Sequence, residues 1–122
     1  MSVCAQTRLR LAAEFRDCRK VFIALGDETR QQIFLTLLEN EELGMRVPDI
    51  TQLTHLSRPA VSHHLQILKD AELINMYRVG TKNYYYIDAN GGQWEKFKNL
   101  SLHVSAVIQR AVAEGYPYPP ED

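Results

Sequence analysis

The sequence predicts a mainly α-helical protein with one small β-hairpin, and three observations lead to this fold class. Residues 49–70 contain two short apolar-periodic segments separated by a tight turn, which is the pattern of two consecutive helices. Residues 73–88 follow with two β-rich runs around a glycine. Residues 7–25 and 93–114 flank this block and carry apolar residues three and four positions apart. This order is typical of a winged helix-turn-helix with five helices, a module that reads DNA.

The first two helices are delimited by glycines and by an acidic cap. Residues 7–25 form the first helix, which Gly26 ends, and Asp27 caps a second helix that runs toward Gly44. The apolar stripe of the first helix comprises Leu11, Phe15, Cys18, Phe22 and Leu25. The side chains of the second helix that we expect to face the core are Ile33, Phe34, Leu37 and Leu38.

The helix-turn-helix lies in residues 49–70. A short third helix opens at Pro48 and Asp49, and a tight turn near His55 leads to a fourth helix that ends at about Lys69. Ser57 can cap this fourth helix by accepting a backbone N–H bond. The inner face of the helix is apolar, with i, i+4, i+7 spacing, and its outer face carries small and polar residues that suit a major groove. The inner residues are Val61, Leu65 and Leu68, and the outer ones are Pro59, Ser62, His63 and Gln66.

The two β-rich runs, residues 73–79 and 83–88, form the wing of this module. They are joined by Gly80, Thr81 and Lys82, and a glycine suits such a turn. Tyrosines at positions 84–86 favour an extended strand. The fourth helix and the wing together predict a set of DNA-contacting residues, which are Ser57, Arg58, Pro59, Ser62, His63, Gln66, Arg78 and Lys82.

The charge distribution is compatible with these contacts, although the net charge is −1. Phosphate contacts need Lys and Arg side chains. Acidic residues concentrate between Asp27 and Asp49, whereas Arg58, Arg78 and Lys82 fall in the predicted DNA-reading region. We therefore expect a basic footprint on one face of the protein.

The last helix spans residues 93–114 and ends at Gly115, before a tail at 116–120 that is expected to be extended. Its apolar stripe comprises Trp94, Phe97, Val104, Ile108 and Ala111. The stripes of the first and last helices exceed the needs of one small core, so we interpret both helices as dimerisation elements. The alternative is that they only cover the back of the core. A homodimer would place two reading helices on a double-stranded, pseudo-palindromic operator.

Length and composition exclude several classes of protein. At 122 residues with 45% hydrophobic content, residues 1–122 are expected to form a single domain. No run of about 18 apolar residues and no signal peptide is present, so we expect a cytoplasmic protein that does not cross a membrane. No phosphate loop, nucleophile elbow or paired carboxylates indicate catalysis, so no enzyme is predicted. The alternative to DNA binding is a winged helix used for protein–protein contact, which the retained basic residues disfavour.

Two runs carry a resemblance to a known family, namely ALGDETR at residues 24–30 and SRPAVSHHL at residues 57–65. Together with the wing residues Arg78, Val79 and Gly80, they closely resemble the ArsR/SmtB family of bacterial repressors over roughly residues 20–90. The resemblance implies a homodimeric transcriptional repressor that leaves its operator when a signal arrives. It also implies that Ser62 and His63 touch bases, with His64 turned toward the protein body.

The chain departs from the metal-sensing members of that family. Their third helix begins with two cysteines, where this chain has Glu42-Leu43-Gly44-Met45 without a cysteine. The last helix offers only His103 as an imidazole ligand, whereas zinc takes four N, S or O ligands. We therefore predict no metal site and no cofactor. A further departure is Glu72, which takes the left-handed position where family members place glycine.

The two cysteines leave a second mode of signalling open. Cys4 and Cys18 are candidates for a redox or metalloid site, which would make the protein a thiol-responsive repressor. The alternative is that Cys18 packs as a small apolar residue on its stripe. The basic residues Arg16, Arg19 and Lys20 would lower the pKa of the Cys18 thiol and burial would raise it, and the sequence alone does not decide between them.

Overall fold

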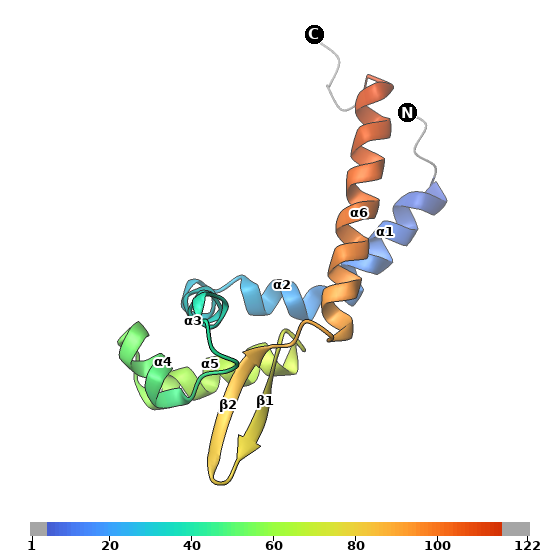
Figure 1. Ribbon diagram of the computed structural model, residues 1–122. Coiled ribbons are helices and arrows are strands. Elements are labelled where there is room, and N and C mark those ends of the chain that lie inside the picture. Colours follow the sequence, from blue (N-terminus) through green and yellow to red (C-terminus); the bar gives the residue numbers. More distant parts are fainter. Residues whose placement is uncertain (1–4, 116–122) are drawn as a thin grey trace. The chain divides into compact units, whose positions relative to one another are not determined.

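The computed structural model describes residues 5–115 (Figure 1). These residues form two compact units, one of residues 19–94 and one of residues 5–18 together with 95–115. Within that range, six helices and one two-stranded antiparallel sheet follow the predicted order, so the fold class is confirmed. The elements are α1 (Ala5–Asp17), α2 (Arg19–Leu25), α3 (Glu28–Glu39), α4 (Val47–Thr54), α5 (Arg58–Asp70), β1 (Ile74–Val79), β2 (Lys82–Ile87) and α6 (Gly92–Ala113).

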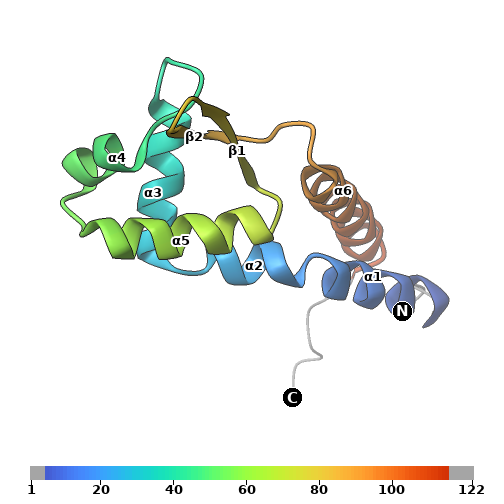
Figure 2. The same cartoon turned by 90° about the horizontal axis from the view of Figure 1, so that it is seen from below.

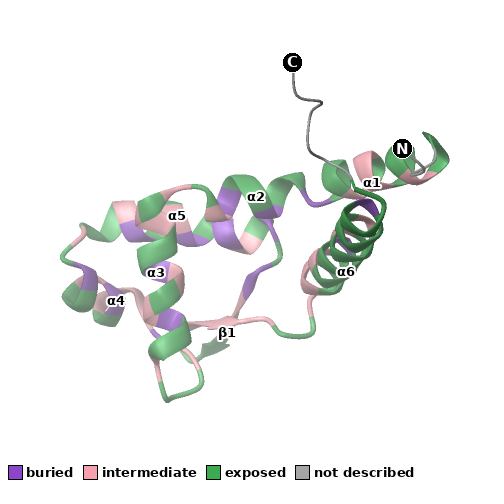
Figure 3. Ribbon diagram, turned by 90° about the horizontal axis from the view of Figure 1, so that it is seen from above, coloured by how far each residue is buried: buried purple, intermediate pink, exposed green. Residues whose placement is uncertain are grey.

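Helix α5 is the centre of the unit formed by residues 19–94. It packs against α2, α3, α4 and β1, and Figure 2 shows α2 and α3 against it. The apolar residues of its inner face, Val61, Leu65 and Leu68, are fully buried. Figure 3 shows buried stretches along α5 and along α2. The i, i+4, i+7 spacing therefore orients α5 as predicted, since it places all three side chains on one side of the helix.

The hairpin wing forms from strands that pair from Ile74 with Ile87 to Val79 with Lys82. Its turn consists of Gly80 and Thr81, and the φ of +61° at Gly80 suits a turn that has glycine first. The turn is one residue shorter than predicted because Lys82 already belongs to β2. Met45 also pairs with Tyr85 through two backbone hydrogen bonds of 2.8 Å, which attaches the segment before α4 to the hairpin.

The connection between α3 and α4 is longer than predicted, because α3 ends at Glu39 and not near Gly44. Gly44 instead lies against the wing with a φ of +97°. A Cβ atom there would lie 3.1 Å from Cβ of Tyr84 and 3.2 Å from Cε1 of Tyr77, so only glycine fits without a shift. The hydroxyl of Tyr77 donates a 2.6 Å hydrogen bond to the carbonyl of Leu43, which holds the connection in place.

The second unit contains α1 and most of α6. Leu100 and Ala111 of α6 are buried, whereas α1 has no buried residue. Glu14 of α1 and His103 of α6 are joined by a hydrogen bond of 2.8 Å. Helix α6 is the longest of the described helices, but no helix within residues 5–115 has both the length and the apolarity that crossing a bilayer requires.

The predicted first helix is two helices, which are separated by a turn at Cys18. The amide of Cys18 bonds to the carbonyls of both Glu14 and Phe15, at 3.2 Å each, and α2 starts after it. The predicted apolar stripe, which assumed one continuous helix over residues 7–25, was therefore wrong. Phe15 is 48% exposed, and the buried positions are Cys18, Val21 and Ala24. Other apolar residues expected to be inward are also exposed, namely Phe22, Leu38 and Ile108.

We predict that Leu65→Ala lowers the free energy of unfolding by about 2–5 kcal/mol, because the deletion leaves a cavity in the fully buried face of α5. The matched control is Leu38→Ala, which removes the same atoms from a side chain that is 59% exposed and should change stability by no more than about 0.5 kcal/mol. Urea denaturation followed by circular dichroism measures both. Equal losses in the two variants would contradict this assignment of the core.

Candidate nucleic-acid interface

The turn between α4 and α5 is set by one strained residue and one cap. His55 adopts a left-handed conformation with a φ of +60°, and its amide bonds to the carbonyl of Thr51 at 2.9 Å, which closes α4. Ser57 then caps α5, since its hydroxyl accepts the amide of Ala60 at 3.2 Å. Pro59 occupies the first turn, where a missing N–H is not needed. The predicted turn and the predicted cap are both confirmed.

The outer face of α5 is open to solvent along its whole length. Every residue predicted to contact DNA from this helix and its cap is exposed, while the inner face is buried. Short side chains on such a face allow a helix to approach base edges closely. The exposed set comprises Ser57, Arg58, Pro59, Ser62, His63 and Gln66.

Gln66 is held by an acidic neighbour that the sequence analysis did not consider. Its side-chain amide donates a 2.8 Å hydrogen bond to the carboxylate of Asp70, one turn further along α5. A glutamine that reads adenine uses both its amide group and its carbonyl oxygen. The bond to Asp70 occupies one of the two N–H groups of Gln66, so its other N–H and its carbonyl oxygen remain for such a contact.

The structure places the two predicted basic residues of the wing on opposite faces of the hairpin. Arg78 pairs with Asn83 and Lys82 pairs with Val79, and successive residues of a strand alternate between faces. Arg78 bends back over the tip, where its Nε donates a 3.0 Å hydrogen bond to the carbonyl of Gly80. Both side chains are exposed near the tip, so the wing presents one positive charge on each side.

Arg30, in the first turn of α3, ties α5 to the turn between α2 and α3. Its guanidinium donates to the carbonyls of Ala24 at 2.8 Å and Ile23 at 3.0 Å, and Nη1 lies 3.5 Å from Nδ1 of His64. His64 is therefore turned toward the protein body, as the sequence predicts, whereas the adjacent His63 is exposed. The contact with Arg30 therefore orients His64, which is adjacent to His63, the histidine predicted to contact bases.

The surroundings of His64 favour the neutral form of its ring. Burial is the largest cause of the lowered pKa of His64, and Arg30 and His63 lower it further, while Asp27 opposes them. A neutral Nδ1 can accept the hydrogen bond from Arg30, whereas a protonated ring cannot. Asp27 caps α3 by accepting the amide of Arg30 at 2.9 Å, and this hydrogen bond is the main reason that the pKa of Asp27 is lowered.

Arg30 holds His64 toward the protein body, a role that was not predicted from the sequence, although Arg30 lies in the run at residues 24–30. A positive charge in the first turn of a helix opposes the helix dipole, so it indicates an interaction elsewhere. That signal was present in the run from Asp27 to Arg30. The partners of Arg30 were not predictable, because the carbonyls of residues 23 and 24 and the ring of His64 meet only in the folded unit.

The second candidate site, at the cysteines, is only partly described. Cys4 lies outside the described residues. Cys18 carries a free thiol that is 1% exposed. Burial is the largest cause of its raised pKa, Asp17 and Glu14 raise it further, and Lys96 opposes them. Burial thus outweighs the neighbouring cations, and the geometry supports a packing role for Cys18.

No cluster of three or more potential metal ligands occurs among residues 5–115. His103, the single histidine of α6, is instead hydrogen-bonded to Glu14. His63 and His64 have ring centroids 5.5 Å apart with ring planes tilted by 57°, which follows from adjacent positions on a helix.

Comparison with known proteins adds to this description. Residues 27–76 match the family described as bacterial regulatory protein, arsR family. The transcriptional repressor SdpR of Bacillus subtilis is 43% identical over 68 residues, which cover 56% of this chain and 72% of SdpR.

Two solved structures share the fold. An ArsR-like transcriptional regulator from Rhodococcus sp. RHA1 matches with a TM-score of 0.71 and 24% identity, over 84% of this chain and 90% of that one. A homodimeric winged helix-turn-helix DNA-binding domain from Mycobacterium bovis matches with a TM-score of 0.56 and 22% identity, over 98% of this chain and 100% of that one. Both likenesses confirm the winged helix-turn-helix architecture.

We predict that the protein loses stability as the pH falls below 6.5, and that His64→Gln reduces this loss. The pKa of His64 is lowered in the folded state, so the unfolded chain takes up a proton near pH 6.5 that the folded chain does not bind. The stabilisation is complete above pH 6.5 and is lost as the pH falls from there toward the lowered pKa. Urea denaturation at pH 7.5 and 5.5 measures the difference.

The matched control for this prediction is His55→Gln, which changes an exposed histidine. It should retain the acid-induced loss of the unmodified protein. If His64→Gln and the unmodified protein lose the same free energy between the two pH values, the linkage to His64 is refuted.

We predict that Cys18 reacts slowly with Ellman's reagent in the folded protein, because its thiol is buried and its pKa is raised. The measurement uses a Cys4→Ser variant, so that Cys18 is the only thiol. The same variant in 6 M guanidinium chloride serves as the unfolded reference and should be labelled within the mixing time. Labelling of the native protein at the unfolded rate would restore Cys18 as a candidate sensor.

Proposed function

This chain belongs to the ArsR family of bacterial regulatory proteins, and we propose that it acts as a homodimeric repressor on a double-stranded DNA operator. The observation that carries this proposal is the geometry of α5. Its inner face is fully buried, so its outer face presents Ser62, His63 and Gln66 as one exposed strip. A strip of short polar side chains on a rigidly held helix suits reading in a major groove.

The proposed contacts divide by type. Ser62, His63 and Gln66 read base edges, helped by Pro59, whose small ring permits close approach. The remaining residues contact phosphates, which position the protein but do not select a sequence. This second group comprises Ser57, Arg58, Arg78 and Lys82.

Dimerisation through α1 and α6 is the second part of the proposal. The Mycobacterium bovis domain of the same fold is described as homodimeric. Here both helices leave large apolar side chains exposed, as a surface that pairs with a second copy does. These are Leu9 and Phe15 of α1, and Leu102, Ile108 and Val112 of α6. Two copies related by a two-fold axis would recognise a pseudo-palindromic sequence.

In this proposal residues 1–122 work as one domain in the cytoplasm, where residues 19–94 read DNA and the helices α1 and α6 join the subunits. SdpR is described as a transcriptional repressor, which supports repression over activation. A signal releases the operator, and no catalytic step is required.

Selection of duplexes from a random pool tests the proposal directly. The purified protein should retain sequences with two related half-sites whose centres lie about 10 bp, or a multiple of that, apart. Sedimentation should give a dimer at micromolar concentration, alone and on the selected duplex. A monomer that retains no sequence above the background of the pool would refute it.

We predict that His63→Ala and Gln66→Ala each cost about 1–3 kcal/mol of binding to the selected operator and relax the preferred sequence. Arg78→Ala and Lys82→Ala should weaken binding to all sequences alike, and each should lower the salt slope by about one. Gel shifts at several salt concentrations on matched and mismatched duplexes separate the two effects.

Lys98→Ala provides the control, since it removes an exposed positive charge that is among neither the proposed DNA contacts nor the apolar residues proposed for dimerisation. Its salt slope and its sequence preference should equal those of the unmodified protein. Altered base preference in the wing variants alone would contradict this division between reading and positioning.

A further inference from the structure

Asp70 is the last residue of α5, and it lies on the same outward strip as the residues proposed to read bases. Each residue turns a helix by about 100°, so Asp70 is rotated by only about 40° from Gln66, one turn earlier. Both side chains are exposed, and Nε2 of Gln66 donates a 2.8 Å hydrogen bond to Oδ1 of Asp70. No ion pair engages this carboxylate within residues 5–115. The hydrogen bond from Gln66 is therefore the interaction that the described structure gives the side chain of Asp70.

A negative charge is unfavourable at the position of Asp70 for two reasons. The carbonyl groups at the C-terminal end of a helix carry partial negative charge, so a carboxylate in the last turn of α5 is destabilising. A carboxylate on a strip that faces DNA also repels the phosphates. The hydrogen bond to a residue one turn away supports the helix only weakly. Helix stability thus gives a poor account of an aspartate at this position.

The carboxylate of Asp70 limits the ways in which Gln66 can contact a base. An ionised carboxylate accepts hydrogen bonds and donates none, so it holds the NH2 group of Gln66 and disfavours a flipped amide whose carbonyl oxygen would face it. With one N–H engaged, Gln66 keeps one N–H and its carbonyl oxygen for a base.

The groups that remain on Gln66 match adenine better than guanine. In the major groove adenine offers an acceptor at N7 and a donor at N6, which pair with one N–H and one carbonyl oxygen. Guanine offers two acceptors, N7 and O6. A glutamine whose two N–H groups are both free can donate to both of them, and the bond to Asp70 removes that mode of contact.

We propose that Asp70 is a positioning residue that sets the specificity of Gln66: by engaging one N–H of the amide, it makes Gln66 select adenine over guanine. Asp70 touches no base and acts only through Gln66. The inference rests on the proposed function, in which Gln66 faces base edges in the operator.

The first measurement compares the affinity of the full chain for two duplexes. They carry adenine or guanine at the operator position where Gln66→Ala relaxes the preferred base. The unmodified protein should prefer adenine there. Asp70→Ala should lower the ratio of the two affinities roughly threefold to tenfold, as expected for the loss of one hydrogen bond. Asp70→Asn keeps an acceptor oxygen and removes the charge, so it should retain the preference for adenine and bind both duplexes more tightly.

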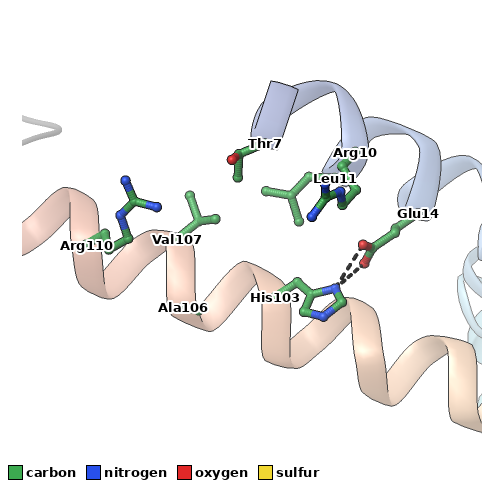
Figure 4. Close-up of a pocket in the computed structure, with 8 residues that line it drawn as sticks. All are labelled: Thr7, Arg10, Leu11, Glu14, His103, Ala106, Val107 and Arg110. Atoms are coloured by element: carbon green, nitrogen blue, oxygen red, sulfur yellow. Dashed lines mark hydrogen bonds and ion pairs between the residues drawn. The ribbon is translucent and has the colours of Figure 1, made fainter. Parts of the chain in front are cut away.

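A double substitution and a matched control isolate the route through Gln66. In a Gln66→Ala background, Asp70→Ala should leave the affinity ratio unchanged, because no amide remains to be directed. The control is Glu14→Ala, which also removes a carboxylate that is hydrogen-bonded to another side chain, that of His103 on α6 (Figure 4). Its affinity ratio should equal that of the unmodified protein. Thermal unfolding checks that all variants fold.

The second measurement follows the hydrogen bond itself without DNA, through the NMR resonances of the side-chain amides. Asp70→Ala should move one of the two amide proton resonances of Gln66. The resonances of Gln31, whose amide donates to the carbonyl of Leu25, should stay in place and serve as the internal control.

Three results would overturn the role of Asp70. They are unmoved Gln66 resonances, an affinity ratio that Asp70→Ala leaves unchanged, and a preferred base other than adenine at this position. An equal loss of preference in Asp70→Asn would assign the effect to charge and would also overturn it. In each of these cases the protein still binds its operator. A protein that selects no operator at all would instead refute the proposed function, and the role of Asp70 with it.

Discussion

The burial of one face of α5 is the interaction on which the rest of the reading unit depends. Val61, Leu65 and Leu68 are fully enclosed by α2, α3, α4 and β1, and each such burial stabilises the fold by about 1.5–3 kcal/mol. Because each residue turns the helix by about 100°, the buried positions also determine which residues face outward. A rotation of α5 by one residue would expose this apolar face and turn Ser62, Gln66 and Lys69 inward in its place. The core therefore selects the residues available to DNA.

Polar contacts refine what the apolar core has oriented. Arg30 joins the carbonyls that end α2 to the ring of His64, so the backbone beside His63 is held from the protein side. Asp70 holds the amide of Gln66 on the solvent side. The contact between Arg30 and His64 is partly buried, whereas the hydrogen bond between Gln66 and Asp70 is exposed. The exposed bond is therefore more easily exchanged for a contact with a ligand. The same helix thus combines a fixed position with an adaptable surface.

The parts of the fold that depend on local chemistry were predictable from the sequence. Ser57 as a cap and a tight turn near His55 follow from neighbouring residues. The left-handed position of Glu72 was implied by the family resemblance, and its φ of +60° agrees. The apolar period of α5 was long and regular enough to orient it. The break at Cys18 was not predictable, because the apolar residues continue through it at spacings that a single helix would also have.

The other features that were not predicted depend on which parts of the chain pack against each other in the folded protein. The expected stripe of α6, from Trp94 to Ala111, did not include Leu100, which the structure buries, since two overlapping apolar faces run along this helix. The exposed faces of Phe15 and Ile108 show the same ambiguity. The contacts of Arg30 join residues up to 34 positions apart in the chain and required the folded unit to be seen. The roles of the DNA-contacting residues remain predictions, whereas their exposure is now known.

The two units differ in how tightly they are packed, and this difference bears on how a signal could act. The unit of residues 19–94 contains most of the fully buried side chains, whereas α1 contributes none. A ligand or a second subunit could therefore rearrange α1 and α6 without unfolding the reading unit. The chain joins the two units between Cys18 and Arg19 and again where α6 begins. There the indole of Trp94 donates a 3.2 Å hydrogen bond to the carbonyl of Leu73, and its ring lies 5.8 Å from that of Phe34. Leu73 directly precedes the wing, so this hydrogen bond links the start of α6 to the wing.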